Sequence, residues 1–195
     1  MKKLKAVIGA MLLSGLVAGA HAANPSAKVF TVGQYYEGGV IYWTDPAQKN
    51  QHGLIADIND QPGAAAYAWS TTNTTTGAIN NGAYAGRTNT TIIVNSGIIA
   101  PAASACVNSG AQGYHDWYLP SEMELAMMFV NQMAITQTAK EHGGSAFADI
   151  NTGNASYWSS IESDAGNAWF FGFLDGLQNI NTKNFALGVR CVRAF

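Results

Sequence analysis

Charged residues are scarce in this chain of 195 residues, in which Lys, Arg, Asp and Glu together make up 11%. Lys2, Lys3 and Lys5 supply three of the 10 basic residues, so the chain beyond them carries 7 basic and 12 acidic residues, a net charge of −5. A nucleic-acid-binding domain is expected to carry a basic patch or stripe, and this balance gives no support for that class. Abundant Asn, Thr, Gly and Ala instead favour a neutral surface with long, hydrogen-bonded loops, as in many extracellular proteins.

Catalytic motifs are also missing. The chain contains no G-x-S-x-G, no G-x-G-x-x-G, no Walker loop and no H-E-x-x-H. Three of the four histidines, His52, His115 and His142, stand far apart and share no metal-ligand spacing. The sequence therefore predicts a protein that is not an enzyme and that has no catalytic residues, metal site or other cofactor.

An apolar run at the start of the chain has the features of a secretory signal. The run Val7–Ala20 follows the three lysines and precedes Ala20-His21-Ala22, the small-x-small pattern that a signal peptidase reads. It is shorter than the roughly 20 residues that a membrane span needs, and an uncleaved anchor is the alternative. We predict a signal peptide at residues 1–22 and a single domain at residues 23–195, exported to the periplasm, the outer surface or the medium.

Only two cysteines occur, Cys106 and Cys191. In an oxidising compartment such a pair most simply forms a disulfide. Closing so long a loop would contribute roughly 4–5 kcal/mol in the chain-entropy account. Two reduced, separately buried thiols are the alternative.

Strand-forming residues gather towards both ends of the chain beyond the leader, with helical patterns between them. This arrangement predicts an α+β domain with two or so helices, short antiparallel sheets and long loops, and with its two ends close together. The Asp175-Gly176 pair predicts a hairpin turn. The expected strands are residues 29–32, 39–43, 53–58, 157–160, 169–174, 177–181 and 186–195.

Two helical stretches are expected in the middle of the chain. One covers part of residues 90–108 and is interrupted near Pro101. The other begins after Pro120, where Ser121 and Glu124 form the Ser-x-x-Glu capping box. The apolar face of this second helix is expected to contain Leu125, Met128, Phe129, Gln132 and Met133.

Residues 59–89 are rich in small and polar residues and predict a long surface excursion, a kind of loop that is uncommon unless it is functional or disordered. Tyr67, Trp69 and Tyr84 lie in it among amide and hydroxyl side chains. Such rings can stack on the apolar faces of sugars, so these three are candidate ligand-binding residues. Anchoring of the loop onto the core is the alternative, because large aromatics bury well. Three tryptophans in or beside regular segments are predicted to be core residues: Trp117, Trp158 and Trp169.

The segment Asp57-Ile58-Asn59-Asp60-Gln61 begins like an EF-hand calcium loop. It then departs from that pattern, because Pro62 stands where the loop needs its Gly. A looser calcium site that uses Asp57 or Asp60 is one interpretation, and both are candidate ligand-binding residues. Solvated surface acids are the other interpretation, and it applies also to Glu162 and Asp164.

Four ordered motifs resemble one bacterial family, the C-terminal domain of the Legionella collagen-like adhesin. Residues 113–125, GYHDWYLPSEMEL, resemble its G-x-x-D-W-x-L-P-S-x-x-E-L signature, and residues 157–162 its Y-W-S-S-T-E strand. Ala168-Trp169 and residues 189–193, VRCVR, resemble its A-W pair and its closing V-R-x-V-R. The motif residues that the resemblance marks as structural are Trp117, Leu119, Pro120, Ser121, Glu124, Trp158 and Trp169.

The resemblance implies a compact fold similar to C-type lectins and formylglycine-generating enzymes, in which a helical cysteine pairs with one in the final strand, as Cys106 and Cys191 would. It also implies adhesion, including binding of sulfated glycans, and no demonstrated catalytic role. Two features depart from that family. Collagen-like repeats are absent, and a net acidic domain would need a local basic patch for a sulfated ligand, for which Arg190 and Arg193 are the candidates.

These observations predict an exported, non-catalytic adhesion domain that binds a glycan or a cell-surface protein through the loops of residues 59–89. The partners expected are therefore a glycan or a surface protein, with no nucleic acid and no membrane span after cleavage. A structural or assembly component of the cell envelope is the alternative. An enzyme related to formylglycine-generating enzymes is a third possibility, which would need reactive thiols or a metal.

Overall fold

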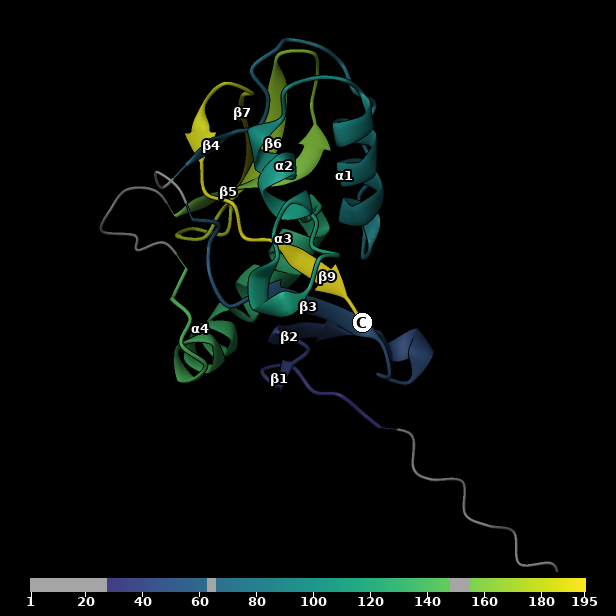
Figure 1. The fold of residues 1–195 in the computed structure, drawn as a ribbon, viewed down its shortest axis with the longest axis vertical. Helices are drawn as coiled ribbons and strands as arrows, with labels where there is room; N and C mark the ends of the chain where they lie inside the picture. Colours follow the sequence, from purple (N-terminus) through teal and green to yellow (C-terminus); the bar gives the residue numbers. More distant parts are fainter. Residues whose placement is uncertain (1–27, 63–65, 148–154) are drawn as a thin grey trace, which may run out of the picture.

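The computed structural model describes residues 28–62, 66–147 and 155–195, and the predicted signal peptide lies outside them (Figure 1). The described part is α+β, as expected, with four α-helices instead of two or so. The helices are α1 (Ala85–Asn95), α2 (Pro101–Val107), α3 (Glu122–Val130) and α4 (Gln132–Glu141), with short 3-10 helices η1 (Pro46–Gln48) and η2 (Ala111–Gly113). The strands are β1 (Tyr35–Tyr36), β2 (Gly39–Thr44), β3 (Gly53–Asp57), β4 (Tyr67–Ala68), β5 (Ser156–Glu162), β6 (Asn167–Gly172), β7 (Gln178–Thr182), β8 (Ala186–Leu187) and β9 (Val192–Ala194).

The strands form three antiparallel sheets, with the orders β1-β2-β3-β9, β4-β8 and β5-β6-β7. Two hydrophobic clusters cover opposite faces of the larger sheets. Ile41 and Ile55 belong to one cluster, whereas their neighbours Val40 and Leu54 belong to the other. Because successive side chains of a strand point to opposite faces, burial on both faces explains why β2 and β3 are continuous apolar runs.

The capping box predicted at residues 121–124 is present. Ser121 Oγ accepts a hydrogen bond from the Glu124 N–H, and the Glu124 carboxylate accepts one from the Ser121 N–H. The expected helix ends at Val130, however, and α4 begins after Asn131. Leu125 and Met128 are buried as predicted, but Met133 is 80% exposed because it lies beyond that break.

The stretch predicted as one interrupted helix is two helices. The first begins at Ala85, before the expected start, and Pro101 opens the second. Proline suits the first helical position, because the N–H it lacks would have no intrahelical partner there. The surface excursion is also shorter than expected, since α1 begins inside it.

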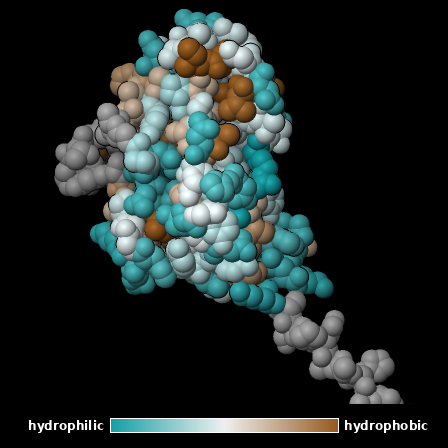
Figure 2. Space-filling view, viewed as in Figure 1, coloured by the Kyte–Doolittle hydropathy of each residue, from teal (hydrophilic) through white to brown (hydrophobic). Residues whose placement is uncertain are grey.

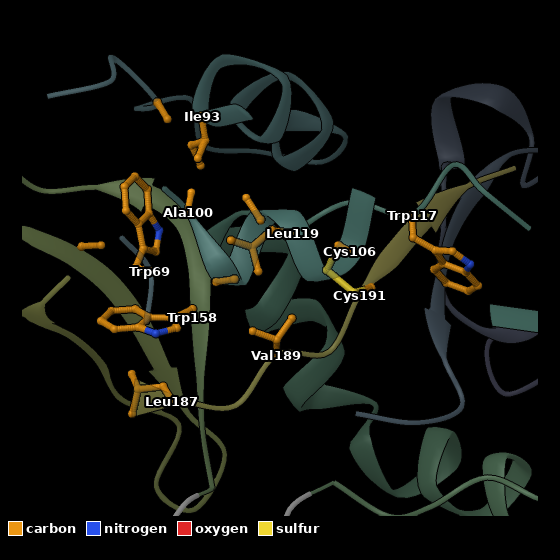
Figure 3. Packing of buried hydrophobic residues seen from close by; sticks show 14 of the residues in the cluster. Trp69, Ile93, Ala100, Cys106, Trp117, Leu119, Trp158, Leu187, Val189 and Cys191 are labelled. Carbon is orange, nitrogen blue, oxygen red and sulfur yellow. A yellow bond between two sulfur atoms is a disulfide. The ribbon is translucent and has the colours of Figure 1, made fainter. Parts of the chain in front are cut away.

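The predicted disulfide joins Cys106 of α2 to Cys191, just before β9 (Figure 3). Neither cysteine is free, so the alternative of two reduced thiols does not hold for this structure. Leu187, Val189 and Cys191 are all buried, as the alternation in the closing segment predicts. The ends of the described chain also meet: the rings of Phe30 and Phe195 lie 4.8 Å apart.

Two expectations about the sheets were wrong. Residues 29–32 form no strand; they lead into a turn at Gly33, which has a φ of 88°, and Val29 is 60% exposed. Trp169 is half-buried and belongs to neither core cluster, unlike Trp117 and Trp158, which are buried as predicted. The hairpin expected at Asp175-Gly176 is present and joins β6 to β7.

Asp116 and Arg193, which belong to two of the four motifs, form an ion pair. The Arg193 guanidinium donates to both carboxylate oxygens of Asp116, with Nε 2.6 Å from Oδ1 and Nη2 3.1 Å from Oδ2. This contact joins the D-W motif to the closing strand. Arg193 also donates to Glu37 and lies over the ring of Tyr114, so it is committed to contacts within the fold. The surface in view in Figure 2 is mainly hydrophilic, with apolar side chains gathered towards its upper end.

Candidate functional site

A cavity of about 770 Å³ lies between the segment that follows β3, Tyr67 of β4, and helix α2 with the turn after it. This volume falls in the range of small-molecule sites. Asp57, Asp60 and Tyr67, three of the predicted ligand-binding residues, line it together. The full lining is residues 57, 59–62, 67, 101, 104, 105 and 108–112.

Helix α2 forms one wall because its two faces differ. Pro101, Ser104, Ala105 and Asn108 recur at i, i+3, i+4 and i+7, which places them on one side of a helix, and all four line the cavity. The opposite side, which includes Ala102, Ala103 and Cys106, is buried in the core. The disulfide therefore holds the buried side of the wall and leaves the lining side free.

Tyr67 is held in place by the buried Trp158, and the neighbouring Trp69 is fixed to the core by a bond of the same kind. The indole N–H of Trp158 donates to the carbonyl of Tyr67 at 2.7 Å, and that of Trp69 donates to the carbonyl of Ser159 at 2.8 Å. The Tyr67 hydroxyl donates to the carbonyl of Pro62, which lines the same cavity. Figure 3 shows Trp69 and Trp158 near each other in the core, with Trp117 at the far end of the cluster.

Asp60 is a paired carboxylate. Its Oδ1 accepts from Arg190 Nε at 2.6 Å, and its Oδ2 accepts from the hydroxyl of Tyr157 at 2.9 Å. The Arg190 side chain is fully buried and also donates to the carbonyls of Asp57 and Ala146. Arg190 thus neutralises Asp60 from behind the cavity wall.

Asp57 is buried and forms no ion pair with any described residue. Its Oδ1 accepts from the N–H of Asn59 at 3.1 Å, and its Oδ2 accepts from the Gln61 amide at 3.2 Å. Burial raises the pKa of Asp57 to about 6, although the Asn59 N–H and the charge of Arg190 act in the opposite direction. Around neutral pH the cavity therefore has an ionised carboxylate at its edge.

The sequence pattern of the Lcl C-terminal domain family matches residues 39–193. This chain belongs to that family. The match covers all nine strands except β1 and the last residue of β9, together with all four helices. Membership indicates an adhesin-type, surface-associated domain, and the disulfide fits an oxidising compartment.

Among solved structures, the fold is similar to that of a fimbrial protein from Bacteroides ovatus, with a TM-score of 0.59 and 14% sequence identity. The similar region covers 84% of this chain and 48% of the fimbrial chain, so this chain spans about half the length of that relative. At this identity the similarity concerns the fold alone. No curated protein matches the sequence.

The other two predicted ligand-binding residues of this Lcl C-terminal domain lie apart from the cavity. Trp69 is 1% exposed and packs in the core, where it offers no free ring face. Tyr84 precedes α1, and its ring packs against Trp43 at 5.6 Å. The polar face of α2 was not predicted, although its i, i+3, i+4, i+7 pattern of small and polar residues is visible in the sequence.

Within the described ranges, no three His, Cys, Asp or Glu side chains are grouped as metal ligands. The calcium interpretation of Asp57 and Asp60 stays a prediction, and each of their four carboxylate oxygens accepts a hydrogen bond from a protein donor. No described helix is long and apolar enough to cross a bilayer.

Proposed function

We propose that this chain is an exported adhesion domain that binds a glycan in the cavity beside α2, without catalysing a reaction. The observation that supports this best is the composition of the lining. Asn59, Gln61, Asn108 and Gln112 provide amide groups, each of which both donates and accepts hydrogen bonds. Beside them, the ring of Tyr67 and two prolines provide apolar surface, a combination suited to sugars with hydroxyl edges and apolar faces.

The non-catalytic part of the proposal rests on how the two carboxylates are used. General acid–base catalysis requires a group that can take or give a proton at the substrate. Asp60 is held by Arg190 and Tyr157, and Asp57 is held by Asn59 and Gln61. Both are therefore engaged in maintaining the wall.

The competing function is assembly into an envelope structure through protein–protein contacts; strand addition is one route to it, and the outer strand β7 is poorly suited to that route. The Leu177 carbonyl accepts a hydrogen bond from the Gly172 N–H, so Leu177 points its backbone groups towards β6. Because these groups alternate in direction along a strand, residues 178, 180 and 182 point theirs away from β6. The outward N–H groups of Ile180 and Thr182 donate to the side chains of Asn179 and Asn181, both at 2.8 Å. An added strand would have to displace these contacts.

The test is binding of the purified, oxidised protein to a broad glycan array, with calcium and again with chelator. Ala105→Trp places a large ring in the cavity. Val107→Trp places the same ring at a position of the same helix that is 42% exposed and does not line the cavity. We expect A105W to lower affinity at least tenfold and V107W to leave it unchanged. A blank array under both conditions, or equal loss in both variants, would overturn the proposal.

A further inference from the structure

The charge of the cavity lining restricts which glycans can bind, an inference that rests on the proposed function. Among the described residues that line the cavity, the formally charged ones are both carboxylates, Asp57 and Asp60, and none is Lys, Arg or His. The neutral polar groups of the lining can donate to or accept from hydroxyls. They cannot compensate a sulfate or a carboxylate on the ligand by ion pairing.

The nearest cation does not change this balance. The side chain of Arg190 is fully buried and is committed to Asp60 Oδ1, to two backbone carbonyls and to the ring face of Phe147, 4.4 Å from its centroid. It is not among the lining residues. Arg190 therefore compensates the charge of Asp60, and its buried guanidinium does not line the cavity.

The second arginine of the closing segment is committed elsewhere. Arg193 pairs with Asp116 and Glu37, and its side chain is 8% exposed. The two arginines that the sequence offered for a sulfated ligand are thus both used within the fold. Asp57 keeps a carboxylate that no described cation pairs, beside a cavity in which water is partly replaced by protein and charges interact more strongly than in bulk water.

We infer that the cavity selects uncharged oligosaccharides and rejects their sulfated or carboxylated counterparts. A neutral sugar loses no ion pair on entering and gains hydrogen bonds from the amide and hydroxyl groups of the walls. An anionic sugar would lie near the buried Asp57 carboxylate, which forms no ion pair with a described residue, and the lining has no basic side chain to compensate the added charge. The cavity therefore discriminates by charge, because its lining has no positively charged side chain that could pair with an anionic sugar.

The experiment is an array on which each neutral oligosaccharide is printed beside its 6-O-sulfated form, followed by titration of the best-bound pair. We expect the neutral member to bind at least tenfold more tightly in 0.05 M salt. The difference should shrink in 0.5 M salt, because added salt screens repulsion. Attraction between the sulfate and a basic site would give the opposite trend, with the sulfated member weakened by salt.

A matched pair of variants tests whether the lining is responsible. Asn108→Lys adds a cation at an exposed lining position, and Val107→Lys adds the same charge at the neighbouring position outside the cavity. N108K should reduce the discrimination to threefold or less, and V107K should keep it. Equal or tighter binding of the sulfated member by the unmodified protein overturns the selectivity alone, whereas binding of neither member overturns it together with the proposed function.

Discussion

Asp57 and Glu162 are two buried carboxylates in opposite circumstances. Asp57 is 1% exposed and Glu162 is 3% exposed. Burial raises the pKa of Asp57 to about 6. Burial would also raise the pKa of Glu162, but the N–H groups of Thr76 and Gly77 and the ammonium of Lys183 outweigh it and lower that pKa below its ordinary value. Two carboxylates of similarly low exposure therefore have pKa values shifted in opposite directions, and only the donors to Glu162 include a cation.

The two sites also differ in what they hold. Lys183 Nζ lies 3.0 Å from Glu162 Oε2, donates to the carbonyl of Thr74 and stands 4.6 Å from the centre of the Trp69 ring. This pair fastens residues 74–77 to the core. Asp57 is the last residue of β3, just before the same excursion, and it lines the cavity. Residues 74–77 are therefore tied to the core by the Lys183–Glu162 ion pair. Asp57, beside the cavity, has hydrogen-bond donors but no described cation to compensate its charge.

The two carboxylates make stability depend on pH in opposite directions. A raised native pKa means that the native state binds more protons than the unfolded chain, so the contribution of Asp57 is present at low pH and is lost as pH rises through about 6. The lowered pKa of Glu162 gives a contribution that is present above its ordinary value of 4.5 and is lost as pH falls through the native value.

The largest loss of stability is expected when the ion pair between Lys183 and Glu162 is broken. Lys183→Met leaves the Glu162 carboxylate buried without its cation, which should lower the free energy of unfolding by about 3–5 kcal/mol. Chemical denaturation at pH 7 measures it. The matched control is Lys140→Met on the exposed side of α4, for which we expect a change within about 0.5 kcal/mol. Similar losses in the two variants would refute the role assigned to the pair.

A smaller effect is expected at the uncompensated site. Asp57→Asn removes a charge that is costly to bury, so the stability of this variant relative to the unmodified protein should rise by about 1 kcal/mol between pH 5 and pH 8. Denaturation at a series of pH values measures the difference. Asp175→Asn removes the same charge from an exposed turn and is the matched control. A pH-dependent gain shared by both variants would contradict the assignment to Asp57.

A third substitution, with the smallest expected loss of stability, tests a hydrogen bond in the cavity wall. Tyr157→Phe removes the hydroxyl that donates to Asp60 and leaves the Arg190 pair in place. We expect a loss of about 1 kcal/mol in the free energy of unfolding, the usual net value of such a bond. A loss as large as that of Lys183→Met would contradict the value assigned to this hydrogen bond.

Local patterns predicted local structure well. The Ser121–Glu124 box, the strands at β2 and β3 and the hairpin at Asp175-Gly176 depend on neighbouring residues, and they were predicted correctly. The strand expected at residues 29–32 was wrong because the glycine that follows adopts a turn. Such a turn depends on long-range contacts, here the hydrogen bond from Gly33 N–H to the Ile41 carbonyl.

The candidate site was predictable only in part, because its second wall comes from a different stretch of the chain. Asp57, Asp60 and Tyr67 were singled out as acids and an aromatic in a polar segment, and they meet at the cavity. The pairing of Asp60 with Arg190 joins residues 130 positions apart and leaves no local signal. The burial of Trp69 and the partial exposure of Trp169 likewise depend on which elements cover each ring.

Cys191 contacts both walls of the cavity. Its carbonyl accepts from the Asp57 N–H at 3.0 Å, which holds one wall, and its sulfur is bonded to Cys106 of α2, which holds the other. One residue thus sets the spacing between the walls. In the reduced protein α2 would keep its packing against the core but lose this covalent link, so we expect reduction of the disulfide to weaken ligand binding at the proposed site.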